Sequence, residues 1–177
     1  EWLGAKDPRP AGAGLYYIDH LTHNVHRGRM DVWTGFYEKL FNFRQIRFFD
    51  IEGRASGLFS RALTSPDGKI RIPINEDAGD SGQIEEYLHI YRGEGIQHIA
   101  CGARDVYETV ETLRADGLPF MPSPPVTYFE KIDARLPQHG EDVVRLQRDG
   151  ILIDGEGVVD GGQTKVLLQI FSANAIG

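Results

Sequence analysis

The sequence predicts an α+β protein built from two copies of one strand–helix–strands module. The first observation is a repeat: Ile96–Ile99 reads Ile-Gln-His-Ile and echoes Ile18–Leu21, Ile-Asp-His-Leu, 78 positions earlier. The second is that an amphipathic helix pattern follows each copy, and strand-like segments follow each helix. We therefore expect a first module over residues 15–92 and a second module over residues 93–177.

The first module contains a strand, a helix and further strands, in that order. Residues 16–25 have the β-rich composition of a strand. Apolar residues then recur at helical spacing from Met30 to Leu40, which predicts a helix over 29–41. Three strands are expected next, at 43–52, 56–63 and 69–75, with turns near Gly53 and at 65–68. Residues 84–91 can add an extended or a helical piece.

The second module follows the same order. Asp105 and Glu108 form an acidic capping box for a helix that ends at Gly117. A short helix is expected near 127–135. Strands are expected at 150–154 and 165–172, with a turn at Asp160–Gly162.

Only two strand candidates follow the second helix, so this module is expected to lack its last strand before Gly177. A missing strand leaves an unpaired sheet edge, and a homo-oligomer is one way to cover it. The Gly- and Pro-rich residues 1–14 are interpreted as the remnant of a linker.

Composition limits the classes of function. The net charge of −7 argues against a nucleic-acid partner, which favours a basic surface. No window approaches the ~20 consecutive apolar residues of a membrane span. The single cysteine, Cys101, excludes an intrachain disulfide and fits a reducing, cytoplasmic compartment. We expect Cys101 to be a small core residue rather than a nucleophile.

Two of the six histidines hold equivalent positions in the repeat, His20 and His98. If the modules pack symmetrically, the two imidazoles converge on one point, and neutral imidazole is a common metal ligand. A carboxylate from a third strand would complete the facial triad typical of non-haem Fe(II). From spacing alone, two structural histidines, or zinc in place of iron, remain open alternatives.

The other four histidines are expected to be structural or exposed. Strand alternation places His23 on the face opposite to His20 and Thr22, so His23 is interpreted as structural. His26 is expected to be exposed, and His89 and His139 to lie on the surface.

Eight segments, in order, resemble the 4-hydroxyphenylpyruvate dioxygenases, and they cover nearly all of residues 15–177. They are Tyr17–Val25, Phe36–Phe43, Ser65–Glu76, Gly82–Leu88, Gly93–Ala100, Arg135–Pro137, Gly150–Gly155 and Leu167–Ser172. The resemblance implies the vicinal-oxygen-chelate (glyoxalase-like) fold, in which paired βαβββ modules form an open barrel. It also implies an Fe(II) enzyme of tyrosine breakdown, which converts 4-hydroxyphenylpyruvate and O₂ to homogentisate and CO₂.

The same resemblance assigns site residues. His20 and His98 match the two iron-binding histidines of the family. Five polar residues match those that line its substrate pocket: Ser60, Asn75, Gln83, Gln97 and Gln169. Because alternation aims Gln97 at the face opposite to His98, its pocket role requires a twist or a bulge.

The family's third ligand is a glutamate in a strand that would follow Gly177. Its N-terminal domain and closing C-terminal helix are also expected outside this sequence, so the 177-residue chain is expected to be inactive alone. Three other functions stay open. They are 4-hydroxymandelate synthase, a metal-free binding or assembly module, and a zinc or nickel hydrolase or lyase of the same fold.

Overall fold

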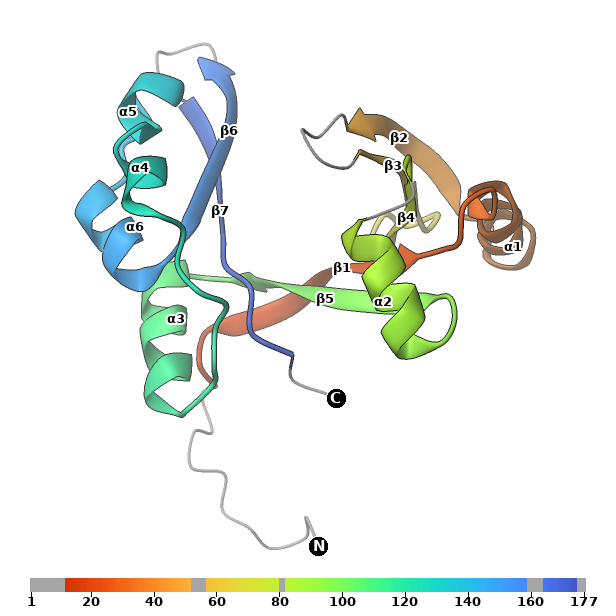
Figure 1. The fold of residues 1–177 in the computed structure, drawn as a ribbon, viewed down its shortest axis with the longest axis horizontal. Helices are drawn as coiled ribbons and strands as arrows, with labels where there is room; N and C mark the ends of the chain where they lie inside the picture. The colour runs from red at the N-terminus through yellow and green to blue at the C-terminus, as the bar shows by residue number, and fades with distance from the viewer. Residues whose placement is uncertain (1–11, 52–56, 80–81, 159–163, 175–177) are drawn as a thin grey trace, which may run out of the picture. The chain divides into compact units, whose positions relative to one another are not determined.

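The computed structural model describes residues 12–51, 57–79, 82–158 and 164–174 (Figure 1). These residues form two compact units. One unit spans Tyr16–Gly102, and the other contains the chain from Ala103 onward together with the residues before Tyr16. The predicted module boundary between residues 92 and 93 stays a prediction.

The unit of Tyr16–Gly102 is a five-stranded sheet with two helices. Its elements are β1 (Leu15–Asn24), α1 (Met30–Phe41), β2 (Arg44–Ile51), β3 (Leu58–Thr64), β4 (Arg71–Asp77), α2 (Gln83–Tyr91) and β5 (Gly95–Ala103). The strand order is β2-β3-β4-β1-β5. β1 runs parallel to β4, whereas β2 and β3, and β3 and β4, are antiparallel. The segment from β1 to β4 is therefore the expected βαβββ module, and β5 adds a fifth strand beside β1.

Helix α1 packs on one face of this sheet because its apolar side chains find a complementary strand surface. Met30 is buried with Leu63 of β3 and Ile72 and Ile74 of β4, and Trp33 packs against the same cluster. The helix ends at Asn42, which adopts the left-handed conformation (φ 55°) and donates its backbone N–H to the carbonyl of Glu38. Burial of this apolar stripe fixes which sheet face is covered.

The strand register determines which side chains lie on the opposite face. His23 pairs with Ile74 of the core, and Asn24 pairs with Asn75. Asn75 in turn pairs with Ser60 of β3. Because side chains alternate along a strand, Asn24, Asn75 and Ser60 share the face that α1 does not cover.

Over its described residues, the second unit combines four helices with a pair of strands. Its elements are α3 (Val106–Ala115), α4 (Val126–Phe129), α5 (Ile132–Arg135), α6 (Val143–Asp149), β6 (Leu152–Val158) and β7 (Thr164–Gln169). β6 and β7 are antiparallel. A buried cluster joins the helices to β6, with Phe129, Leu146 and Ile153 almost fully inaccessible. The Tyr128 hydroxyl donates to the Ile153 carbonyl and accepts from its N–H, each at 2.9 Å.

Most predicted elements are confirmed, and the differences have physical causes. The α+β class, the helices over 29–41 and after Asp105, and all the predicted strands are present. Residues 84–91 are helical, and the stretch 127–135 forms two short helices rather than one. Helix α6 was not predicted. The expected turn at Asp160–Gly162 lies outside the described residues.

Two side-chain predictions were wrong. His139 is buried, with 7% exposure, because Asp133 binds its Nε2 at 2.9 Å and the Glu141 N–H binds its Nδ1 at 3.0 Å. Cys101 is exposed, because β5 contributes no side chain to either of the buried apolar clusters. His26 and His89 are exposed, and His23 is buried, as predicted.

The strands of the described residues form a five-stranded and a two-stranded sheet, not a closed barrel. Over the same residues, every helix is too short or too polar to cross a membrane.

Candidate metal centre

The two repeat-related histidines lie on neighbouring strands. His20 is on β1 and His98 is on β5, and their ring centres are 5.5 Å apart with an interplanar angle of 75°. With metal–nitrogen bonds of about 2.1 Å, two imidazoles on one ion place their ring centres roughly 4.5–5.5 Å apart. The observed separation therefore fits two ligands of a single metal ion.

The ring of His20 is held by the residue that precedes it. Its Nδ1 lies 2.9 Å from Oδ2 of Asp19. The other carboxylate oxygen, Oδ1, accepts from Arg71 at 3.0 Å and from the Tyr17 hydroxyl at 3.2 Å. Because an ionised carboxylate only accepts, Nδ1 of His20 carries the proton in this contact.

The carboxyl group of Asp19 is ionised at neutral pH. Burial raises its pKa, but the hydrogen bonds from His20 and Tyr17 and the charge of Arg71 outweigh burial, so the pKa lies below its ordinary value. The acceptor that faces His20 is therefore a negative charge.

The ring of His98 is also held on Nδ1 by the preceding residue. Oε1 of Gln97 lies 2.5 Å from Nδ1 of His98, and the Thr22 hydroxyl lies 2.8 Å from Nε2. Burial, and secondarily the proximity of His20, lower the pKa of His98. His98 is therefore neutral at pH 7, which is the state that a metal requires.

A metal ion fits these donors only in part. Two neutral imidazoles suit zinc, iron and other first-row metals. Among the described residues, however, no group of three histidine, cysteine or carboxylate side chains could surround one ion. The described chain therefore offers two ligands, and a complete site requires further ones.

Three polar residues form a row on the sheet face opposite to α1: Asn24, Asn75 and Ser60, on three adjacent strands. Asn24 is 4% exposed and Ser60 is 8% exposed. The side-chain oxygens of Asn24 and Asn75 are buried and lack a hydrogen-bond partner within the described part of the chain. Such unpaired acceptors are costly, which makes them candidates for binding a ligand donor.

The other predicted pocket residues are more dispersed. Gln97 contacts His98 directly, as described above. Gln83 begins α2 and is exposed. Gln169 ends β7, in the other unit, where it pairs with Leu152 and is half-buried.

Four residues of this neighbourhood were missed from the sequence: Asp19, Thr22, Asn24 and Arg71. A signal existed for two of them, because Thr22 and Asn24 follow His20 at intervals of two and so share its face. Arg71 had no such signal, since its contact with Asp19 depends on the parallel pairing of β1 and β4.

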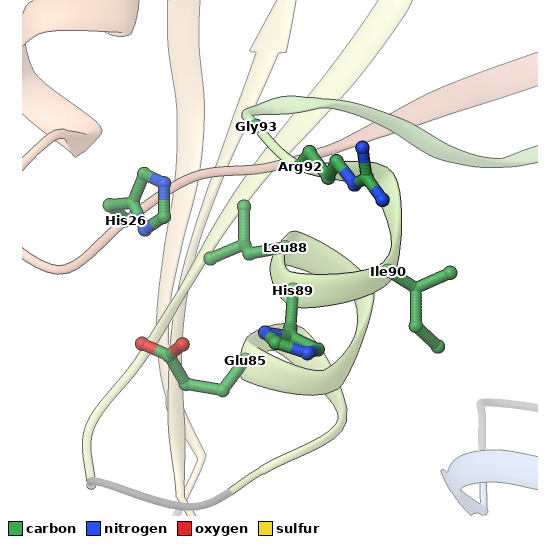
Figure 2. A pocket seen from close by; sticks show the side chains of 7 residues that line it. All are labelled: His26, Glu85, Leu88, His89, Ile90, Arg92 and Gly93. Carbon is green, nitrogen blue, oxygen red and sulfur yellow. The ribbon is translucent and has the colours of Figure 1, made fainter.

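A surface depression lies away from the histidine pair. It has a volume of about 700 Å³ and is lined by residues of α2, the segment after it, and His26 (Figure 2). Figure 2 shows His89 and Glu85 on the same helix as Leu88, near His26. The lining contains neither His20 nor His98, so this depression is not part of the candidate metal centre.

The sequence pattern of the Glyoxalase/Bleomycin resistance protein/Dioxygenase superfamily matches residues 17–149. The chain belongs to this superfamily, and the predicted vicinal-oxygen-chelate fold is confirmed. A variant of 4-hydroxymandelate synthase from Streptomyces coelicolor has a similar structure, with a TM-score of 0.77 at 22% identity. That match covers 98% of this chain and 46% of the synthase, and it concerns the fold alone.

Two relatives are more similar in sequence. The chain is 59% identical to hemolysin VllY of Vibrio vulnificus over 164 residues, which are 93% of this chain and 44% of that protein. It is 55% identical to 4-hydroxyphenylpyruvate dioxygenase of Pseudomonas aeruginosa over 177 residues, which are 100% of this chain and 48% of that enzyme. The chain thus spans about half the length of these relatives. The resemblance stated from the motifs is confirmed, and it implies a metal cofactor.

Proposed function

We propose that this chain is part of an Fe(II)-dependent dioxygenase that converts 4-hydroxyphenylpyruvate and O₂ to homogentisate and CO₂. The observation that carries the proposal is the pair His20 and His98 on adjacent strands, whose ring centres are 5.5 Å apart. The Nδ1 atom of each ring is hydrogen-bonded to the side chain of the preceding residue. Identity of 55% to an enzyme of that name, along the whole chain, supports the choice of substrate.

In this proposal the Nε2 atoms of His20 and His98 hold the iron, and a carboxylate outside this sequence completes the site. Two histidines and one carboxylate are the ligand set typical of non-haem Fe(II) oxygenases, because it leaves positions open. The ion would supply Lewis acidity toward the 2-oxo acid and electrons toward O₂. Thr22, which now bonds Nε2 of His98, would release that nitrogen to the metal.

The polar row is proposed to orient the substrate. The hydroxyl of the phenol ring is the hydrogen-bond donor of 4-hydroxyphenylpyruvate. The amide oxygens of Asn24 and Asn75, which have no partner among the described residues, are acceptors. Ser60 can extend the row, since it pairs with Asn75 across the strands. Gln83, Gln97 and Gln169 stay proposed pocket residues on the strength of the family resemblance.

The partners would be an aromatic 2-oxo acid and O₂, and the reaction would belong to tyrosine breakdown. A cytoplasmic location agrees with the single cysteine. A homo-oligomer would cover the edge strands of the five-stranded sheet.

The test is product analysis with the natural protein that contains this sequence. After anaerobic Fe(II) loading, the protein receives 4-hydroxyphenylpyruvate and O₂, and products are separated by liquid chromatography with mass detection. We expect homogentisate as the product. Hydroxymandelate would show the synthase instead, and a protein that neither binds iron nor turns over substrate would be a metal-free module.

Histidine variants connect the product to the proposed centre. His20→Ala and His98→Ala should each abolish turnover and iron retention in equilibrium dialysis. His26→Ala removes an exposed histidine just after β1 and should leave turnover and iron retention unchanged. Full turnover by His20→Ala would disprove the assignment of the ligands.

A further inference from the structure

We propose that Asp19 is the positioning residue of the candidate metal centre: it holds the His20 imidazole so that Nε2 faces the metal, and Arg71 holds Asp19 in turn. This inference rests on the proposed function, because it takes His20 as a metal ligand. It assigns Asp19 no contact with the substrate or the reacting atoms.

The contacts of Asp19 divide cleanly between its two oxygens. Oδ2 faces Nδ1 of His20 at 2.9 Å, and Oδ1 accepts from Arg71 at 3.0 Å and from Tyr17 at 3.2 Å. The Arg71 guanidinium also lies 3.4 Å from the backbone carbonyl of Asp19. Two anchors on one oxygen restrict rotation of the carboxylate, which leaves the second oxygen aimed at the ring.

The tautomer of His20 follows from this contact. A free neutral imidazole exchanges its proton between the two nitrogens, and only the unprotonated nitrogen can bind a metal. In the neutral ring, a proton donated from Nδ1 to Asp19 leaves the lone pair on Nε2. Loss of the carboxylate would let the ring rotate and change tautomer.

The second copy of the repeat shows the same device independently. In both copies the residue just before the histidine engages Nδ1: Asp19 for His20 and Gln97 for His98. One acceptor is anionic and the other is a neutral amide. A carboxylate partner strengthens the bond of its histidine to a metal, so His20 should be the stronger ligand of the pair.

The expected effect is on metal affinity. Outer partners of metal-bound histidines typically contribute 10–100-fold in affinity or activity. We expect Asp19→Ala to weaken Co(II) binding by roughly 10–100-fold. Asp19→Asn should lose less, because its amide oxygen still accepts from Nδ1 although the charge is gone. Arg71→Met should produce a smaller loss than Asp19→Ala, because it frees the carboxylate without removing it.

The experiment uses two readouts on the natural protein that contains this sequence. The first is Co(II) titration followed by visible absorption. The second is the ¹⁵N spectrum of the His20 ring in the metal-free protein, which reports the tautomer. Asp31→Asn is the matched control, because the Asp31 side chain is exposed on α1 and its ionic partner is Arg61, not a histidine.

Asp19→Ala should shift His20 away from the Nδ1–H tautomer and weaken Co(II) binding, while Asp31→Asn changes neither. An unchanged tautomer and unchanged affinity in Asp19→Ala would overturn the inference and leave the histidine pair standing. If the wild-type protein binds no metal, the proposed function fails, and the tautomer spectrum still decides whether Asp19 holds the ring.

Discussion

At the scale of single residues, His23 differs sharply from its neighbour on β1, His20. His23 is 3% exposed, its Nδ1 lies 3.1 Å from the Tyr37 hydroxyl, and its ring centre is 4.4 Å from that of Trp33. Burial lowers the pKa of His23, and the charge of Glu94 opposes this only in part. The side chain is thus a neutral core residue that bridges β1 and α1.

Because His23 is buried in its neutral form, the stability of the fold should depend on pH. Its pKa is lower in the folded than in the unfolded chain, where it is near 6.5. The unfolded state therefore binds more protons below about pH 6.5, and stability falls as the pH drops through this window, by at most about 1.4 kcal/mol per pH unit. We expect His23→Gln to lose less stability between pH 7.5 and 5.5 than the wild type, in urea unfolding.

The control for this comparison is His26→Gln, because His26 is exposed. His98, whose pKa is also lowered, is present in every variant and cancels in the difference. An equal loss of stability on acidification in His23→Gln and wild type would contradict the prediction.

The sequence predicted some residues of the candidate site and not others, for one physical reason. Strand alternation and the repeat were sufficient to select His20 and His98 and to set His23 apart. The same rule aimed Gln97 away from His98, yet its side chain reaches the ring at 2.5 Å. Alternation describes where a side chain leaves the strand, and a long, flexible amide can still bend back to its neighbour.

At the scale of elements, Glu94 joins the start of β5 to the start of α1. Its carboxylate accepts from the Trp33 indole at 2.8 Å, from the His26 backbone N–H at 3.0 Å and from Arg29 at 3.3 Å. The Glu94 side chain is only 11% exposed. Burial raises its pKa, but these hydrogen bonds outweigh it, so the pKa of Glu94 lies below its ordinary value.

Removal of the Glu94 carboxylate should lower the stability of the unit of Tyr16–Gly102. We expect Glu94→Ala to lower the free energy of unfolding by about 2–4 kcal/mol, because three donors lose a partly buried acceptor. Glu38→Ala, an exposed acid on α1, should change it by less than about 0.5 kcal/mol. Because the folded pKa is depressed, the Glu94 contribution is present above the unfolded pKa and is lost as the pH falls through the folded pKa. Equal stabilities of the two variants at pH 7 would refute this role.

Substitution by alanine should have opposite effects on stability at Gly155 and at Gly35. A Cβ at Gly155 of β6 would lie 2.9 Å from the Lys165 carbonyl oxygen and 3.1 Å from Leu136. Gly35 lies inside α1, and apart from its neighbours and the helix backbone no atom of the described chain lies within 4 Å of its Cβ position. We expect Gly155→Ala to destabilise by about 1–3 kcal/mol and Gly35→Ala to stabilise by up to about 1 kcal/mol. Thermal unfolding of both variants is the measurement, and the same sign for both would contradict it.

Helix α1 was predicted because apolar residues recur along it at helical spacing, and helix α6 was missed because it lacks that pattern. Helix α1 shows four apolar residues at helical spacing, whereas α6 has seven residues and a single buried apolar side chain, Leu146. Its ends did carry signals, since Asp142 caps it and Gly150 terminates it in the left-handed conformation. Caps without periodicity did not suffice to predict a helix.

At the scale of the whole molecule, the repeat predicted the module that the structure contains. The strand order β2-β3-β4-β1, with β1 parallel to β4, is the expected βαβββ arrangement, and β5 joins it beside β1. Both histidines lie within the unit of Tyr16–Gly102, on neighbouring strands. The ligand set, however, is not a property of this neighbourhood alone, because the described residues supply two imidazoles and no third metal-binding side chain.

If a carboxylate outside this sequence completes the site, as proposed, the isolated 177-residue chain should bind metal weakly and produce no homogentisate. Compared with the natural protein, we expect its Co(II) affinity to be lower by at least about 100-fold, since even outer partners of a ligand contribute 10–100-fold. A carboxylate added in solution can occupy the vacant ligand role, so acetate should strengthen Co(II) binding to the isolated chain, whereas chloride at equal ionic strength should not. The acetate effect should disappear in His20→Ala, which retains one imidazole. Tight metal binding or sustained turnover by the isolated chain would show that the two histidines need no external carboxylate.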